Sequence, residues 1–456
     1  MSRFFGTIEH FFEKLLLPRW MAPEWMSTAE QVGFYITTWL GVIFMLCYTY
    51  QFFYVFVAFV RRPRRYPDAP QNKRFAVVIA ARNEERVLPS LLESLRDQTY
   101  PQALIDVYVV ADNCTDQTAA VARRGGAKVF ERYAKSRVGK GYALEFLFDR
   151  IGALRGWRYY DAYLVFDADN VLRPNYIAEM NKAFAAGYRV LTSYRNSKNY
   201  GKSWISAGYA LWFMRESRHL QNPRALLGGS AMISGTGFLV DSRLIEQNGG
   251  WKHFLLTEDI EFSADCIIKG ERVGYCHAAE LFDEQPETFE ASWRQRKRWA
   301  RGMFQVIRHY GWRLLRGALC LRWSCFDMAM NILPAFLLST LQLLSITALF
   351  VINLLVTGVF SKVLFHFLLD FLVFGYGIFW LLGALAMLSE WRHIHCRKRR
   401  AVLLLFAFPV FMLSYIPISV AALCARRVEW QAIEHKRAMT AAEIEMGGIR
   451  AEKRDQ

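Results

Sequence analysis

The sequence predicts an α/β domain inserted between transmembrane helices, and two observations support this fold class. No residue from Gln31 to Val60 carries a charge, and apolar runs return after Arg322; a helix needs about 20 such residues to cross a bilayer core. From Phe75 to Val306 short apolar runs alternate with amphipathic stretches, the pattern of a parallel sheet flanked by helices. The chain therefore joins a membrane part to a water-soluble domain.

The N-terminal part predicts a membrane span at residues 31–60, preceded by an interfacial segment at residues 1–30. In that segment Phe4, Ile8 and Phe11 recur at helical spacing, which favours an amphipathic helix on the membrane surface; a plain apolar lead-in fits the same residues. The span ends at a basic cluster at residues 61–65. Because Lys and Arg collect at the cytoplasmic ends of spans, the domain that follows is expected in the cytosol.

The soluble domain is expected over residues 61–306. Strands are predicted at residues 75–81, 105–111, 127–131 and 162–166, with helices near 86–98, 117–124 and 142–154. In an open α/β sheet, ligands bind beyond the carboxyl ends of the strands. Polar residues that directly follow a strand are therefore the first candidates for a functional site.

The C-terminal part predicts an interfacial helix at residues 307–327, three or more transmembrane helices at 328–425 and a cytosolic tail at 426–456. The uncharged or nearly uncharged runs are residues 328–361, 363–389 and 401–425. Three crossings from the cytosol would leave the C-terminus outside, whereas the basic residues after 425 favour a cytosolic end. An extra short crossing or an interfacial helix between residues 326 and 389 would resolve this conflict, and the sequence leaves both open.

The net charge limits the classes of partner that the sequence predicts, and the cysteine content limits the classes of structural site. The formal net charge is +16, but the basic residues crowd beside apolar runs, as at 61–65 and 397–400, which favours membrane lipids over nucleic acid as the partner. The eight cysteines include no CxxC pair. We therefore expect neither a zinc site nor a secreted disulfide framework.

Carboxylates follow two of the predicted strands. Asp167 and Asp169 come directly after residues 162–166 and offer the oxygen ligands that Mg²⁺ or Mn²⁺ on a diphosphate prefers; a solvated turn is the alternative. Asp112 also follows a strand and could accept hydrogen bonds from a base or a ribose. Residues 112–116, however, are equally well explained as turn and helix-cap chemistry.

A third acidic element is Thr257-Glu258-Asp259, which lies between apolar residues. Glu258 and Asp259 are candidate catalytic carboxylates, with Asp259 as the general base that takes a proton from an acceptor hydroxyl. The alternative is that these residues form the acidic first turn of a helix.

Gln295, Arg298 and Trp299 fall on one basic stretch with helical character. Arg298 can form charge-assisted hydrogen bonds to a diphosphate, and Trp299 offers a flat face to a sugar ring. A basic helix without a ligand would rarely combine these residue types at this spacing. Lys140, between Gly139 and Gly141, is a further candidate for a phosphate contact.

These elements, in this order, resemble the signature of processive family 2 glycosyltransferases. They are Asp112, Asp167-Ala168-Asp169, Thr257-Glu258-Asp259 and Gln295-x-x-Arg298-Trp299. Cellulose synthase catalytic subunits and poly-N-acetylglucosamine synthases are similar in layout. The resemblance implies a GT-A (Rossmann-like) domain at the cytosolic face of the cell membrane, in a multi-pass protein that uses a UDP-sugar donor.

The resemblance also implies a role for each residue. Asp112 would contact the uridine, Asp167 the nucleotide portion and Asp169 the metal ion, while Asp259 would be the base and Gln295, Arg298 and Trp299 would hold the diphosphate and the acceptor. Gly235 and Thr236 lie in a small-residue loop, Ser234-Gly235-Thr236-Gly237, that looks like the loop which touches the terminal acceptor sugar.

The resemblance implies transfer of a hexose or N-acetylhexosamine, with inversion, to a growing β-linked polysaccharide. Export of the product would be helped by the spans of the chain itself or by accessory membrane subunits. One alternative keeps this chemistry but places a single sugar on a membrane lipid. Another, of a different class, is a scaffold subunit with a lapsed active site that assists a partner synthase.

Overall fold

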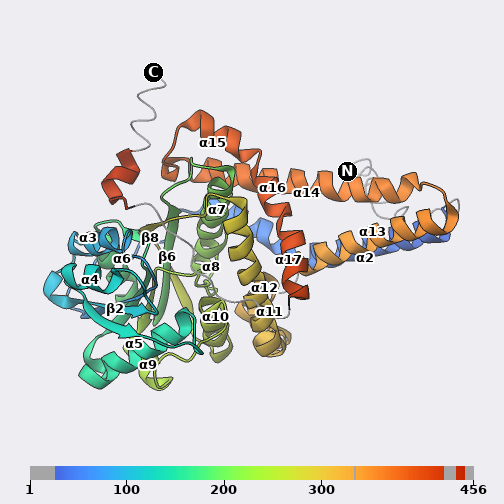
Figure 1. Ribbon diagram of the computed structural model, residues 1–456. Helices are drawn as coiled ribbons and strands as arrows, with labels where there is room; N and C mark the ends of the chain where they lie inside the picture. The colour runs from blue at the N-terminus through green and yellow to red at the C-terminus, as the bar shows by residue number, and fades with distance from the viewer. Residues whose placement is uncertain (1–25, 333–334, 426–437, 447–456) are drawn as a thin grey trace, which may run out of the picture.

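A computed structural model of the chain describes residues 26–332, 335–425 and 438–446. It contains an α/β domain from which three long helices extend as an arm (Figure 1). The amphipathic helix expected within residues 1–20, and most of the expected tail after residue 425, lie outside the described residues.

The α/β domain is built on one sheet of eight strands, in the order β3-β2-β1-β4-β7-β6-β8-β5. The strands are β1 (Phe75–Ala81), β2 (Ile105–Asp112), β3 (Lys128–Arg132), β4 (Ala162–Asp167), β5 (Val171–Leu172), β6 (Val190–Ser197), β7 (Phe238–Asp241) and β8 (Val273–Asp283). The four predicted strands are present. They form a parallel sheet, as predicted. The strands that were not predicted make the whole sheet mixed, because β7 runs antiparallel to both β4 and β6, and β5 is antiparallel to β8.

Helices cover both faces of this sheet. They are α3 (Leu88–Arg96), α4 (Thr118–Arg124), α5 (Lys140–Arg155), α6 (Tyr176–Ala185), α7 (Trp204–Arg215), α8 (Asn222–Leu226), α9 (Ser242–Gln247) and α10 (Glu258–Lys269). Alternate residues of β1 point to opposite faces: Val77 packs in a core with α3, α4 and α6, and Val78 in a core with α5, α9 and α10. This burial on both faces explains why the strand reads as a continuous apolar run.

The arm consists of α2 (Thr28–Val60), α13 (Ala335–Thr357) and α14 (Lys362–Ser389), and it projects away from the domain (Figure 1). These are the three continuous helices in the described residues that are long and apolar enough to cross a membrane. At the base of the arm lie α11 (Phe289–Leu319) and α12 (Trp323–Ile332). Thus α11 begins inside the soluble domain and continues through much of the expected interfacial region.

The last predicted span, at residues 401–425, is broken into α15 (Lys398–Leu405), α16 (Phe408–Leu413) and α17 (Tyr415–Cys424), with a bend of 45°. Counted as one unit, the bent pair would be a fourth span. It packs against the domain, because a Cβ atom on Gly208 of α7 would lie 2.4 Å from the Phe411 ring. After it, Ile444 is buried against Val171 and Phe282 of the α/β domain.

Candidate functional site

Lys140 joins the separately predicted elements into one site. It opens α5, and its Nζ donates hydrogen bonds to Asp167 Oδ1 at 2.5 Å and to the main-chain oxygen of Gly235 at 2.7 Å. Glu258 Oε1 lies 3.8 Å from the same nitrogen. Burial alone would lower the pKa of Lys140, but Asp167 and Glu258 outweigh it and the pKa is raised. The lysine is therefore a charged ammonium that holds two acidic elements together.

Asp259 is fixed from the opposite side of the same loop. The Gly235 N–H donates to Asp259 Oδ2 at 2.6 Å, at the N-terminus of α10, where the helix dipole favours a carboxylate. Gly235 has φ +82°, which suits glycine. Burial raises the pKa of Asp259, and Lys140 opposes that shift. A half-buried carboxylate with a raised pKa and a fixed orientation has the properties of a general base.

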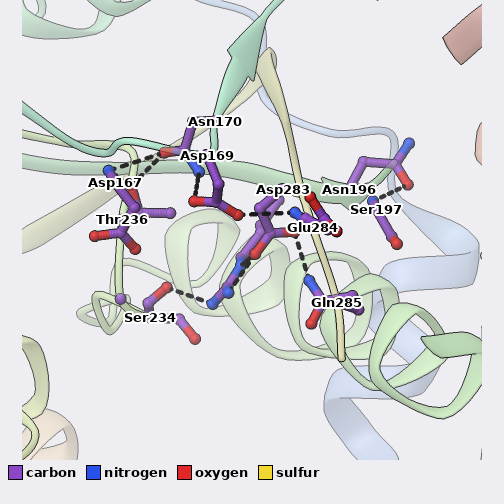
Figure 2. A network of polar contacts seen from close by, with 12 residues as sticks. Asp167, Asp169, Asn170, Asn196, Ser197, Ser234, Thr236, Asp283, Glu284 and Gln285 are labelled. Carbon is purple, nitrogen blue, oxygen red and sulfur yellow. Dashed lines mark hydrogen bonds and ion pairs between the residues drawn. The ribbon is translucent and has the colours of Figure 1, made fainter. Parts of the chain in front are cut away.

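The carboxyl end of β4 is tied to this loop through Thr236 (Figure 2). Its hydroxyl accepts a hydrogen bond from the Asp167 N–H at 2.9 Å and donates to Asn170 Oδ1 at 2.5 Å. The antiparallel strand β7 follows directly after this loop and pairs with β4. The strand order thus explains how residues almost 70 positions apart in the sequence meet.

A second group of charged residues surrounds Asp169, and the sequence-based prediction missed it. Asp169 Oδ2 accepts a hydrogen bond from the Glu284 N–H at 2.9 Å, next to Asp283 at the end of β8 (Figure 2). Arg195 of β6 donates from Nε to Asp283 Oδ2 at 2.6 Å. Carboxylates after a strand were the signal used for Asp112 and Asp167. The same signal would have identified Asp283 and Glu284 had β8 been predicted.

The residues around Asp169 fit a divalent cation. Burial raises the pKa of Asp283, Arg195 opposes this, and the nearby Asp169 raises the pKa further, so a cation would relieve repulsion between two buried carboxylates. In the part of the chain that the structure describes, no three His, Cys, Asp or Glu side chains could hold a metal ion by themselves. Mg²⁺ commonly binds one or two carboxylates and completes its shell with substrate phosphates. Asp169 would then be the protein ligand, and the ion would neutralise charge on a departing diphosphate.

Asp112 lies at the end of β2 with its carboxylate engaged by protein groups. Arg132 donates to Asp112 Oδ1 at 2.5 Å, and the Asn113 amide donates to the same oxygen at 3.0 Å. Burial raises the pKa of Asp112 and Arg132 opposes that shift. Contact with a uridine stays a prediction, and Arg132 would share in it.

The segment with Gln295, Arg298 and Trp299 lies on α11, which packs closely against the start of α10. A Cβ atom on Gly302 would lie 2.5 Å from Thr257 Cγ2. Arg298 Nη1 donates to the Leu256 main-chain oxygen at 3.4 Å. Burial raises the pKa of Glu258 to about 7, and Lys140 and Arg298 are the cations that oppose this rise. The structure therefore brings this segment beside Glu258 and Asp259.

Two polar oxygens, one on α11 and one on the residue that precedes α10, have no hydrogen-bond partner among the described residues. They are Gln295 Oε1 and Thr257 Oγ1, and both are buried. An unsatisfied buried oxygen costs about 1–3 kcal/mol. A bound substrate with hydroxyl groups could supply the missing donors. Trp299 lies 5.7 Å, ring centre to ring centre, from Tyr209.

Comparison with known proteins places this site in a family. Residues 70–302 match the family described as "Glycosyltransferase like family 2". The chain is 26% identical over 295 residues to a beta-monoglucosyldiacylglycerol synthase of Nostoc sp., covering 61% of this chain and 59% of that protein. It is 23% identical over 250 residues to a poly-beta-1,6-N-acetyl-D-glucosamine synthase of Staphylococcus epidermidis, covering 54% of this chain and 58% of that protein.

A solved structure shares the fold. It is a mannosyltransferase from Pyrobaculum calidifontis in complex with GDP-Man and Mn²⁺, matched with a TM-score of 0.54 at 15% identity over 86% of this chain and 100% of that one. The expected GT-A-like fold, with long apolar helices before and after the domain, is confirmed. With the family match covering residues 70–302, this chain belongs to the family 2 glycosyltransferases.

Proposed function

We propose that the protein transfers a hexose from a UDP-sugar to a lipid acceptor in the membrane. The arrangement of Lys140, Asp167, Gly235 and Asp259 supports the transfer chemistry. The lipid acceptor is favoured by similarity to beta-monoglucosyldiacylglycerol synthases, including those of Nostoc sp. and Synechocystis sp.. This chain spans 59% of the length of the Nostoc sp. protein and 49% of that of the Synechocystis sp. protein.

In this proposal Asp259 accepts the proton of the acceptor hydroxyl as that oxygen attacks the anomeric carbon. The Gly235 N–H donates to one oxygen of this carboxylate and so helps to orient it. When no donor is bound, the Lys140 ammonium neutralises the charge of the Asp167 carboxylate. Attack opposite the departing UDP inverts the anomeric configuration.

The position of the site beside the membrane part also favours a lipid acceptor. Arg296, between Gln295 and Arg298, contacts the broken segment that follows the arm, and Trp299 packs beside α7. A lipid headgroup would therefore have a short path from the bilayer to Asp259. Such a path needs no channel through the arm.

We further propose that the α/β domain is cytosolic and that α15 to α17 do not cross the membrane. The domain end of the arm carries the basic clusters at residues 61–65 and 397–400, as cytoplasmic ends do. Ile444 packs on the α/β domain, so the chain between the domain and residue 444 makes an even number of crossings. The helices α13 and α14 supply two, which would resolve the conflict between the apolar runs and the basic tail.

Polysaccharide synthesis is the second candidate, and similarity to the poly-beta-1,6-N-acetyl-D-glucosamine synthases favours it. The two functions share donor chemistry and differ in the acceptor. They separate by product: a glycolipid is extracted into organic solvent, whereas a polymer stays in the aqueous or insoluble fraction with high molecular weight.

The deciding experiment is to incubate detergent-purified protein with membrane lipids, Mg²⁺ or Mn²⁺ and a panel of labelled UDP-sugars. We expect one donor to label a product in the organic extract. Asp259→Asn should lower the rate about 10²–10⁴-fold with UDP binding retained, whereas the exposed Asp97→Asn should leave it unchanged. High-molecular-weight product would replace the lipid with a polysaccharide acceptor, and no transfer from any of the UDP-sugars would reject the proposed function.

A further inference from the structure

Lys198 lies in the candidate site, and the roles assigned above do not use it. It directly follows β6, and its main-chain N–H donates to the Asp283 oxygen at 2.9 Å. This bond fixes the lysine next to the end of β8, which carries Asp283 and Glu284. The residue is 6% exposed.

The ammonium group of Lys198 is buried without a hydrogen-bond acceptor. Its Nζ has no partner among the described residues. Burial lowers the pKa of Lys198, and the carboxylates of Asp169, Glu284, Asp283 and Glu84 oppose that shift. These four carboxylates belong to the loop after β4, the end of β8 and the loop after β1. Lys198 therefore lies where these three segments of the candidate site meet.

A buried ammonium without a hydrogen-bond acceptor is costly, because the group loses its hydration and only longer-range attraction to the carboxylates offsets this loss. Other buried cations of the site have defined partners: Lys140 bonds Asp167, and Arg195 bonds Asp283. Lys198 differs from them although carboxylates surround it. Its three N–H donors therefore suit an acceptor that arrives with a ligand.

We propose that Lys198 donates to a phosphate oxygen of the nucleotide diphosphate, beside the cation that Asp169 would hold. This inference rests on the proposed function. A phosphate oxygen is a strong acceptor for an ammonium point charge. The nearby carboxylates would repel a diphosphate that arrives without a cation, so the ammonium and the metal would act together on it. Lys198 would then stabilise the charge that collects on UDP as the sugar departs.

The test is UDP binding in the presence of Mn²⁺, measured by titration calorimetry on the full-length protein in detergent. Lys198→Met keeps the length of the side chain and removes the charge, and we expect the dissociation constant to rise roughly 10- to 100-fold, as for a lost charge-assisted hydrogen bond. Lys202→Met is the matched control, because Lys202 is exposed four positions further along the chain. Its affinity should equal that of the original protein.

Separate controls distinguish a role of Lys198 from misfolding of the variant and from an incorrect donor. A cooperative thermal transition checks that Lys198→Met is folded, and Lys198→Gln provides a second neutral variant if the methionine variant does not fold. Unchanged UDP affinity in either folded variant overturns the inference. Weaker binding of the UDP-sugar alone, with UDP unaffected, would assign Lys198 to the sugar and also overturn it. Failure of the original protein to bind UDP would instead reject the proposed donor.

Discussion

The guanidinium of Arg296 donates from Nη1 to the main-chain oxygen of Phe411 at 2.8 Å, and so connects α11 to the break between α16 and α17. The same nitrogen donates to Ser414 Oγ at 2.8 Å, and the guanidinium carbon lies 4.4 Å from the centre of the Phe411 ring. A broken helix leaves main-chain carbonyls that need donors. Arg296, in the middle of the Gln295–Trp299 segment, thus binds the broken segment beside the membrane helices. Arg298 instead binds Leu256, next to the catalytic carboxylates.

Replacing Arg296 with alanine should destabilise the protein by about 2–3 kcal/mol, because a charge-assisted hydrogen bond and a cation–π contact are lost together. The measurement is thermal unfolding in detergent. Arg294→Ala is the control on the same helix: Arg294 pairs with the exposed Glu290, and such surface pairs contribute about 0–1 kcal/mol. Equal melting temperatures for the two variants would contradict a structural role for Arg296.

Removing the charge of Lys140 should move the pH dependence of transfer. Burial raises the pKa of Asp259 and Lys140 opposes that rise, so Lys140→Met should raise this pKa further. The base works only when ionised, and activity is lost as the pH falls through its pKa. We therefore expect the acidic limb of the pH–rate profile to move upward by about 1–3 pH units. The exposed Lys135→Met should leave the limb in place, and an unshifted limb in Lys140→Met would argue against Asp259 as the base.

Both the backbone conformation and the close packing at position 237 require a glycine. Its φ is +66°, and an added Cβ would lie 2.0 Å from Leu281 Cδ2. At Gly228 φ is +77°, yet nothing lies within 4 Å of an added Cβ. Gly228→Ala should therefore show only the backbone cost of about 1–2 kcal/mol, and Gly237→Ala should lose a further 1–3 kcal/mol or so through overpacking. Thermal melting of the two variants gives the comparison, and similar losses would mean that the β8 side chain moves aside freely.

Asp169→Asn should weaken the activation of transfer by a metal ion more than it lowers the stability of the fold. Chelation should abolish transfer by the original protein, and Mn²⁺ or Mg²⁺ should restore it. In the variant, the Mn²⁺ concentration for half-maximal activity should rise at least about 10-fold, because one anionic oxygen ligand becomes neutral. The exposed Asp97→Asn provides the control. Restoration at the same Mn²⁺ concentration in both variants would remove Asp169 as the ligand.

The proposed topology predicts which positions face outward. In a cysteine-free background, Val359→Cys at the exposed tip between α13 and α14 should react in intact cells with a maleimide that does not cross membranes. Met446→Cys, on the domain side, should react only after lysis. Labelling of residue 446 in intact cells would show that the bent segment at residues 398–424 does cross.

The sequence by itself determined which residues are candidates for the chemistry and which parts of the chain are apolar. Asp167, Asp169, Glu258 and Asp259 could be proposed because each follows a strand or opens a helix, and these are local signals that strand periodicity and helix-start rules detect. The long helices α2, α13 and α14 were equally visible, because a bilayer-length apolar run is also a local property.

Only the tertiary structure decided how these residues pair. Strand order places β7 antiparallel between β4 and β6, and this brings Gly235 between Lys140 and Asp259, which lie more than a hundred positions apart. The same holds for Lys198 beside Asp283, and for Arg296 beside Phe411. Hydropathy depends only on how many apolar residues a run contains. It cannot show that a distant side chain, here Arg296, supplies hydrogen bonds to the carbonyl groups where a helix is broken. The run at residues 401–425 therefore predicted one continuous span, whereas the folded chain forms three short helices that partly pack on the catalytic domain.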